Sequence, residues 1–435
     1  MKIFTAEPYS AVSEDKLIDF KNGTYLAYFT VRWSGQVKVQ VRLVHPVEIL
    51  PDIKLNLQGV FGANHTFIGN FMSNASGATE ERLCRYFQTL PGPVCNLGNR
   101  QSHGPWFCEK PKNVHLTCDN WKFHQMYTKP FESFVKIDAH LSALSLESLT
   151  KYYLADIKNK CAITVRDRMT SHTSVNESLG LPYCSIRGLP ATVETNGHFF
   201  KGRWFPNDCR VHDFSKEDFT SCIAHKRLIL LGDSTVRQMY FYFRDSFSKV
   251  FKVLPTKDKI CLKQGPITLW NETLNASIYF HFHGLPIFGT GLVLRTDFVQ
   301  YVADALDSMG SGSSDIIVIS VWSHLLAAGK EFYINRWRAI KSAIQRYLDR
   351  NPNAKVIIKS ANTRNSGSSW SNVISSIWNI HQFEGFLREL FEGEKKIGFV
   401  DAFDITKVQP FIDHVHPNIV IVKEIINRVL TYICK

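Results

Sequence analysis

A serine lies where a buried strand is predicted to give way to a helix. Residues 228–231 form an apolar run of the length of a buried parallel strand, and Gly232 and Asp233 follow it. Apolar residues then recur at helical spacing over residues 236–243. We therefore expect Ser234 to project from the carboxyl edge of a sheet, beside helix amide groups that stabilise developing negative charge. A serine in that position is a candidate nucleophile.

A candidate base lies near the other end of the chain. The segment 413–417 reads Asp-His-Val-His-Pro and precedes the apolar run 419–433, which predicts a closing helix. A histidine can take the serine proton, and a carboxylate can orient the imidazole ring. Because both loop-to-helix junctions can face one rim of a parallel sheet, we expect Ser234, His416 and Asp413 to form a catalytic triad.

The same residue types also have structural interpretations. Asp and Ser at a strand end often cap a helix, because their side chains accept hydrogen bonds from free helix amides. Arg237, one helical turn after Ser234, fits a surface ion pair, or a pocket in which it holds an acyl oxygen or a substrate carboxylate. The presence of Asp413 and His416 favours catalysis at Ser234 over capping alone.

Paired histidines raise a metal-dependent hydrolase as an alternative. His281 and His283 share one face of a predicted strand, and His414 and His416 form a second pair beside Asp413. No Glu-x-x-His or His-x-x-x-His helix accompanies these pairs. We expect ordinary hydrogen-bonded histidines at positions 281 and 414, and no metal site.

Length and charge restrict the classes of protein. A chain of 435 residues is long for a single core and predicts two domains, and its hydrophobic content of 44% indicates a folded protein. No apolar run is long enough to span a bilayer, and the first residues lack a visible signal peptide. The net charge of +12 calls for an acidic partner. Dispersed Lys and Arg without a nucleic-acid-binding motif favour an anionic glycan, a phosphorylated acyl donor or simple solubility over nucleic acid.

Cysteines and glycosylation sequons indicate the secretory pathway. The cysteines form an even set of ten without a Cys-x-x-Cys pair, so we expect disulfides, at positions 84, 95, 108, 118, 161, 184, 209, 222, 261 and 434. Asn-x-Ser/Thr sequons predict glycosylation at Asn22, Asn64, Asn74, Asn176, Asn271 and Asn275.

Two kinds of periodicity divide the chain. Residues 25–33 place apolar side chains on one face, and after the Ser34-Gly35 turn residues 37–43 alternate apolar with polar, which predicts a β-hairpin in an all-β module. From about residue 160, strands alternate with helices; the strands are predicted at 228–231, 315–319, 355–358 and 397–400, and the helices at 337–347 and 383–391. Alternation of this kind predicts an α/β domain, with a parallel sheet covered by helices.

These motifs resemble a known enzyme superfamily. The residues that carry the likeness are Gly232-Asp233-Ser234, Arg237, Asp413-x-x-His416, Gly202-x-Trp204, Cys209 and Cys222. They look like the SGNH, or GDSL-type, hydrolases and more closely like the PC-esterase branch. Nearly the whole chain resembles the NXPE family of neurexophilin and PC-esterase domain proteins. The resemblance implies an immunoglobulin-like, neurexophilin-type β-sandwich with a Cys-rich end at 1–120, a connecting segment at 121–160, and a three-layer α/β/α SGNH-type catalytic domain at 161–435.

The resemblance also implies roles for individual residues. Ser234 would be the nucleophile, His416 the general base and Asp413 the group that orients it. The oxyanion would be bound by the amide of Ser234 and by Gly284. The usual Gly-x-Asn-Asp block is missing, because Trp322-Ser323-His324 follows the strand 316–321. His324 or Arg237 would then fill the role of the missing asparagine.

The implied activity is acyl transfer. PC-esterase relatives include O-acetyltransferases that act on sialic acids and on plant wall polysaccharides, so we expect acetyl transfer from acetyl-CoA, as a co-substrate, to a glycan or sialoglycoprotein. Hydrolysis of an acetyl ester is the same chemistry with water as acceptor. A third reading is an inactive secreted ligand that binds a cell-surface protein through its N-terminal module. The family implies a Golgi or secreted location, so the missing signal suggests an N-terminally shortened form.

Overall fold

The computed structural model divides the chain into two compact units that are not contiguous in sequence. Unit 1 comprises Met1–Leu50, Leu146–Ala224 and Ile357–Lys435, and unit 2 comprises Pro51–Ser145 and His225–Val356. The structure describes residues 1–44, 51, 54, 57–59, 67–87, 90–126, 155–157, 162–166, 180–190, 196–256, 261–288, 293–364, 374–410 and 414–435. The domain boundaries expected at 120 and 160 stay a prediction.

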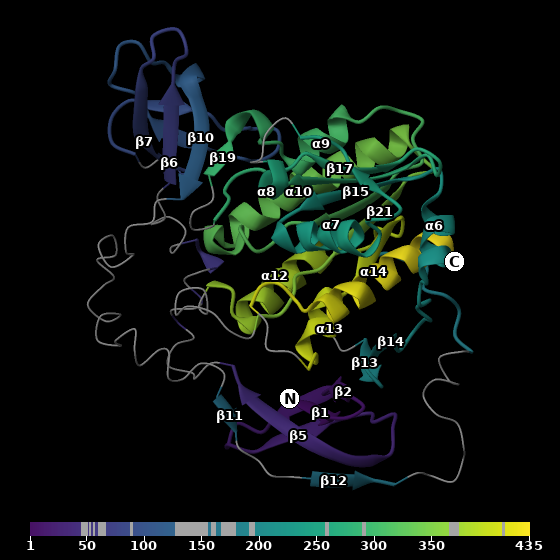
Figure 1. The fold of residues 1–435 in the computed structure, drawn as a ribbon. Helices are drawn as coiled ribbons and strands as arrows, with labels where there is room; N and C mark the ends of the chain where they lie inside the picture. The colour runs from purple at the N-terminus through teal and green to yellow at the C-terminus, as the bar shows by residue number, and fades with distance from the viewer. Residues whose placement is uncertain are drawn as a thin grey trace. The chain divides into compact units, whose positions relative to one another are not determined.

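Unit 2 contains the strand that leads to Ser234. Its sheet has the order β16 (Lys252–Val253), β17 (Ile267–Asn271), β18 (Ala276–Phe282), β15 (Arg227–Gly232) and β20 (Ile316–Ser320). Strand β15 pairs in parallel with both β18 and β20, whereas β17 pairs antiparallel with β18. Helix α7 (Ser234–Ser246) packs against β15, β18 and β20. Figure 1 shows α7 and β15 in the same part of the fold. The expected mixed α/β class with parallel strands is thus confirmed.

A second sheet of unit 2 is antiparallel and disulfide-bonded. Its order is β19 (Val293–Arg295), β10 (Trp121–Met126), β6 (Phe67–Met72), β7 (Thr79–Arg85), β9 (Phe107–Glu109) and β8 (Val94–Asn96). Disulfides join Cys84 to Cys108 and Cys95 to Cys118. Because β10 pairs with β19, residues near 123 and 294 belong to one sheet. The helices of this unit include α8 (Cys261–Gln264), α9 (Val302–Ser308) and α10 (Gly329–Arg350).

Unit 1 joins the two ends of the chain. Its N-terminal sheet has the order β11 (Ala155–Ile157), β5 (Gly35–Leu43), β1 (Lys2–Thr5), β2 (Ser10–Ser13), β13 (Gly197–Phe200) and β14 (Arg203–Pro206), and β12 (Ala162–Val165) also pairs with β5. Strand β21 (Lys355–Lys359) belongs to the sheet that contains β15; its residues begin in unit 2 and continue in unit 1. Strand β22 (Ile397–Val400) follows β21 in the order of that same sheet. The helices among its described residues are α6 (Lys216–Ile223), α12 (Ile377–Leu390), α13 (Ala402–Lys407) and α14 (Ile419–Cys434). Disulfides join Cys184 to Cys209 and Cys222 to Cys434. Disulfide formation is thus confirmed for eight of the ten cysteines, and for Cys161 and Cys261 it stays a prediction.

The predicted hairpin of residues 25–33 with 37–43 is wrong. Strand β4 (Tyr25–Tyr28) pairs with β3 (Lys16–Asp19), and β5 pairs with β1 instead. The apolar side chains beyond β4 still reach the core, because Phe29 and Val31 pack against a cluster that contains Trp33 and Val37. That packing needs no strand pairing, whereas Tyr25 remains 59% exposed.

No helix of the described residues is long and apolar enough to cross a membrane. The four disulfides among those residues fit a protein of an oxidising compartment, because disulfides persist in secreted and lumenal proteins.

A buried ionic cluster connects α12 with the ends of β21 and β22. Arg388, which is fully buried, donates from Nη2 to Asp401 Oδ2 (2.8 Å) and lies 3.8 Å from Glu384 Oε2. Glu384 Oε1 also accepts a hydrogen bond from the amide of Ala361 (2.7 Å). Burial raises the pKa of Glu384 to about 7, although Arg388 and the Ala361 amide oppose the shift.

The first prediction concerns the glycine that ends β15. Gly232 has a φ of 155°, and a Cβ there would lie 2.0 Å from the carbonyl oxygen of Ser320. We expect Gly232→Ala to lower the free energy of unfolding by at least about 1 kcal/mol, measured by urea denaturation. The control is Gly310→Ala, where the new methyl group meets nothing within 4 Å. Equal midpoints for the two variants would contradict the packing described for β15 and β20.

The second prediction concerns pH. An unfolded glutamate loses its proton near pH 4.3, whereas folded Glu384 keeps it until about pH 7. Between these pH values, folding is therefore coupled to the uptake of a proton by Glu384. The stability that this proton contributes is fully present at low pH and is lost as the pH rises to about 7. Glu384→Gln keeps an acceptor for Ala361 and has no proton to lose, so its stability relative to the wild type should rise from pH 4.5 to pH 7.5.

The measurement is the urea midpoint at both pH values, with the exposed neighbour Glu389→Gln as control on the same helix. A constant difference between the wild type and Glu384→Gln would show that Glu384 titrates like a solvated carboxyl group.

Candidate active site

Ser234 is the first residue of helix α7 and follows the central parallel strand β15. The run of residues 228–231 is buried, as expected for a strand covered on both faces. The N-cap of α7 is Asp233, whose Oδ1 accepts from the backbone N–H of Thr235 (2.9 Å). The expected strand, turn and helix are confirmed, and Ser234 is half-buried at their junction.

The Asp233 carboxylate links this turn to the loop after β20. It is fully buried, and its Oδ1 also accepts from the hydroxyl of Thr235 (2.7 Å). Its Oδ2 accepts from the amides of Trp322 (3.3 Å) and Ser323 (3.2 Å) and from the hydroxyl of Ser323 (3.2 Å). Five donors thus surround one buried carboxylate, which is what a charge needs to be tolerated away from water. Asp233 therefore fixes where Ser234 stands relative to residue 323.

Three adjacent parallel strands end at one edge of the sheet. Gly232 is in register with Phe282 of β18 and with Ser320 of β20. The residues that follow these strand ends are Ser234, Gly284 and His324, respectively. The structure thus brings the predicted nucleophile and two of the predicted oxyanion donors to the same rim, where α/β sheets bind their ligands.

Gly284 lies in a closely packed loop. Its φ is 85°, and a Cβ there would meet the ring of Tyr301 at 2.5 Å, so only glycine fits. The next carbonyl, of Leu285, accepts a hydrogen bond from Nη2 of Arg336 (2.8 Å). Arg336 belongs to α10, is fully buried, and also donates to the carbonyl oxygen of His103. Sequence reasoning did not identify Arg336, because its spacing in α10 carries no signal of a buried charge.

Two histidines lie beside the Asp233 turn. The ring centroids of His283 and His324 are 5.2 Å apart. The amide of Phe288 donates to Nδ1 of His324 (2.9 Å), so the ring proton of His324 is assigned to Nε2. His283 is fully buried, and burial together with the neighbouring His324 holds its pKa well below the usual range. His283 is therefore a neutral ring at physiological pH, whereas His324 presents an N–H donor.

Arg237 is half-buried and lies in the first turn of α7. Its Nη1 donates to the carbonyl oxygen of Lys263, and its guanidinium lies 5.8 Å from the ring centroid of Phe282 and 5.9 Å from that of Phe241. Burial lowers the pKa of Arg237, and the nearby Asp233 opposes the shift. These contacts hold the arginine against aromatic rings, and no carboxylate of the described residues forms an ion pair with it.

The predicted base lies at a second helix start, in unit 1. His416 is exposed and precedes Pro417 and Asn418, and Asn418 is the N-cap of α14 through a hydrogen bond from the amide of Val420 (3.0 Å). The carbonyl of Val415 accepts from Nδ2 of Asn362 (3.3 Å). Asp413 lies outside the described residues. The triad of Ser234, His416 and Asp413 stays a prediction.

The other histidines that the metal-site alternative would use are His281 and His414. His281 is buried and its Nδ1 bonds the carbonyl of Phe282 (2.9 Å), which confirms a hydrogen-bonded role. His414 is exposed. Within the described ranges, no three His, Cys, Asp or Glu side chains are grouped so as to hold a metal ion.

Four of the six sequons lie in the described part of the chain. Asn22, Asn74 and Asn275 are exposed in turns, and Asn271 is half-buried at the end of β17. Asn64 and Asn176 lie outside the described residues. Glycosylation at all six positions stays a prediction.

Comparison with known families identifies both parts of the chain. Residues 204–434, more than half of the chain, match the family described as NXPE family member 4-like, C-terminal domain. Residues 8–131 match the family described as Neurexophilin. This combination is the one expected from the sequence motifs, and the chain therefore belongs to the NXPE family.

Proposed function

We propose that Ser234 is the nucleophile of an acyl transfer reaction of the PC-esterase type. The observation that carries the proposal is the position of Ser234 as the first residue of α7, with Asp233 rather than Ser234 as the N-cap. Capping therefore does not explain the serine. The match of residues 204–434 to the NXPE C-terminal domain supports a PC-esterase-like chemistry. We also propose the fold that the family resemblance implies, in which a neurexophilin-type, immunoglobulin-like β-sandwich precedes a three-layer α/β/α SGNH-type domain.

The proposed first step forms an ester on the enzyme. The Oγ of Ser234 attacks the acetyl carbonyl of the donor while His416 accepts the hydroxyl proton, with Asp413 orienting the ring. The carbonyl oxygen becomes an oxyanion, and the amides of Ser234 and Gly284 and the Nε2–H of His324 are the proposed donors. The bond to the donor's sulfur then breaks, and the thiol leaves with the proton from His416.

The second step releases the acetyl group to an acceptor hydroxyl. A carbohydrate hydroxyl gives its proton to His416 and attacks the acyl carbon, and Ser234 recovers its proton when the ester bond breaks. The proposed donor is acetyl-CoA, and the proposed acceptor is a glycan, including sialic acid on a glycoprotein, within the secretory pathway. Water as acceptor would give an acetylesterase, and exclusion of water from the site would favour transfer.

The third prediction is that Ser234→Ala abolishes acetyl transfer. Purified protein is given acetyl-CoA with a sialylated glycan and, separately, an acetylated glycan, and the acetyl group is followed by mass spectrometry. Loss of the acyl-enzyme should lower turnover by at least about a thousandfold. The control is Ser246→Ala, at the other end of the same helix.

Undiminished turnover in Ser234→Ala would remove the serine from the mechanism. Activity only with the acetylated glycan would identify a hydrolase. No activity of the wild type in either assay, together with binding to a cell-surface protein, would favour the inactive ligand.

The fourth prediction tests His324 as the substitute for the missing asparagine. His324→Ala removes the proposed Nε2–H donor and should reduce turnover about 10²–10³-fold with little change in KM, because an oxyanion donor acts in the transition state. His324→Gln, whose side-chain amide also donates, should recover part of the loss. A change confined to KM, or equal activity of the two variants, would assign His324 a structural role.

A further inference from the structure

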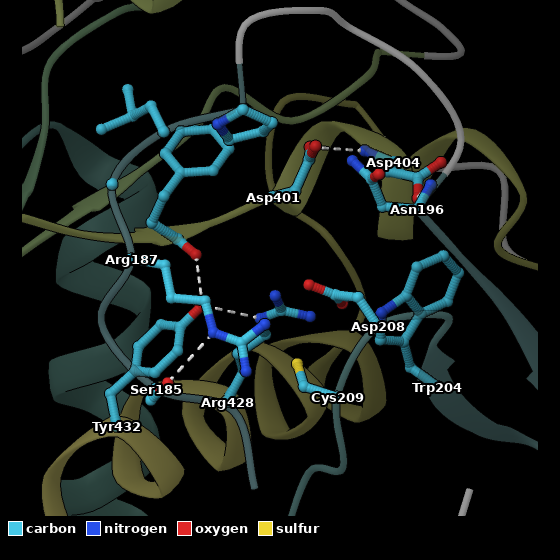
Figure 2. Close-up of a pocket in the computed structure, with 14 residues that line it drawn as sticks. Ser185, Arg187, Asn196, Trp204, Asp208, Cys209, Asp401, Asp404, Arg428 and Tyr432 are labelled. Atoms are coloured by element: carbon cyan, nitrogen blue, oxygen red, sulfur yellow. Dashed lines mark hydrogen bonds between the residues drawn. The ribbon is translucent and has the colours of Figure 1, made fainter. Parts of the chain in front are cut away.

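A cavity in unit 1 is lined by residues that the proposed acyl chemistry does not use. Its volume is about 210 Å³. Figure 2 shows its lining, which includes Arg187, Trp204, Asp208, Asp401, Asp404 and Arg428. Pockets for drug-sized ligands usually measure 300 Å³ or more, so this cavity suits a smaller molecule.

The walls of this cavity are held in place by long-range bonds. The disulfide between Cys184 and Cys209 ties the loop of residues 185–190 to the segment that carries Asp208. The amide of Gly188 donates to the carbonyl of Ile397 (3.1 Å) in β22. The amide of Asn196 donates to Oδ2 of Asp404 (2.7 Å). The lining residues are therefore fixed before any ligand binds.

Arg428 is oriented so that its two Nη nitrogens, the fork of the guanidinium group, remain available to a ligand. Its Nε donates to the hydroxyl of Tyr432 (3.1 Å), which in turn donates to the carbonyl of Phe399 (2.6 Å). Neither Nη nitrogen of Arg428 is hydrogen-bonded to another described residue. Arg187 bonds only Oγ of Ser185 through its Nε (3.2 Å) among those residues. Figure 2 shows both guanidinium groups among the lining side chains.

The carboxyl groups of the cavity carry less negative charge than their number suggests. Asp401 is ion-paired with Arg388 (2.8 Å). Burial, with the neighbouring Asp401, raises the pKa of Asp404 well above its usual range, so this carboxyl group keeps its proton at neutral pH. Asp208 remains as an exposed carboxylate at the edge. Of the three carboxyl groups, only Asp208 then contributes a negative charge that no other described residue has neutralised. Arg187 and Arg428 together carry two positive charges, so the cavity can accept a ligand with a single negative charge.

We propose that this cavity binds a small hydroxycarboxylate, with the carboxylate on the Nη fork of Arg428 and the hydroxyl groups on Asp208, Asp401 and Asp404. A guanidinium fork matches a carboxylate bidentately, and carboxyl oxygens accept bonds from hydroxyl groups. The apolar face of the ligand would lie against Trp204, which is buried. A phosphate dianion is disfavoured, because Asp208 and Asp401 would repel its second charge. The site does not depend on acyl chemistry at Ser234.

The test is calorimetric titration of the full chain with D-glucuronate as the probe. The comparison ligands are D-glucose, which lacks the carboxylate, acetate, which lacks the hydroxyl groups, and phosphate. We expect D-glucuronate to bind most tightly. Arg428→Lys keeps the charge but loses the fork, so it should weaken D-glucuronate at least about tenfold.

Arg187→Gln, at an exposed position, should weaken the binding of D-glucuronate by a smaller factor than Arg428→Lys does. This variant provides a second test of the cavity if Arg428→Lys lowers the melting temperature. The control is Arg338→Gln, an exposed arginine of α10 that bonds Asn335, which should bind like the wild type. Equal affinity for D-glucose and D-glucuronate, tighter binding of phosphate, unchanged affinity in both cavity variants, or no binding of any probe would each overturn the proposal.

Discussion

The candidate active site depends on the hydrogen bonds that the buried carboxylate of Asp233 accepts. Two of its hydrogen bonds come from Thr235 in α7, and three come from Trp322 and Ser323, which follow β20. A carboxylate held this way offers acceptors only, so every surrounding polar group must be a donor. The nucleophile turn and the 322–324 loop therefore form one rigid edge, although about ninety residues separate them in sequence.

The second support of that edge comes from buried positive and aromatic groups. Arg336 holds the carbonyl of Leu285, and Tyr301 closes the space above Gly284. Burial of an unpaired guanidinium is costly, and Arg336 forms no ion pair with a carboxylate of the described residues. Burial lowers the pKa of Arg336 to about 10. The structure offsets this cost with two backbone carbonyls and with the ring of Tyr301, whose centroid lies 4.7 Å from the guanidinium. Preorganisation of this kind is what an oxyanion-binding loop requires.

Local sequence patterns predicted helices and strands but did not predict the contacts between residues that are distant in sequence. The run of residues 228–231 became β15 and the run 419–433 became α14, because burial and helical periodicity are properties of neighbouring residues. The pairing of β5 with β1 was not predicted, since a strand's alternation does not name its partner. The same holds for the Cys222–Cys434 disulfide. The Gly-Asp-Ser triplet indicated Ser234, but the link from Asp233 to Ser323 has no local signature.

The NXPE chain thus presents, in unit 2, a serine at a preorganised sheet edge and, in unit 1, a cavity that contains the guanidinium group of Arg428. The central claim is that Ser234 carries an acyl group during turnover. The most direct measurement is peptide mapping of the wild-type protein after acid quench during reaction with acetyl-CoA. The account predicts one acetylated peptide, containing residues 232–237, with the acetyl group on Ser234 and its loss when an acceptor glycan is added. An acetyl group on another residue, or product formation with residues 232–237 unmodified throughout, would contradict it.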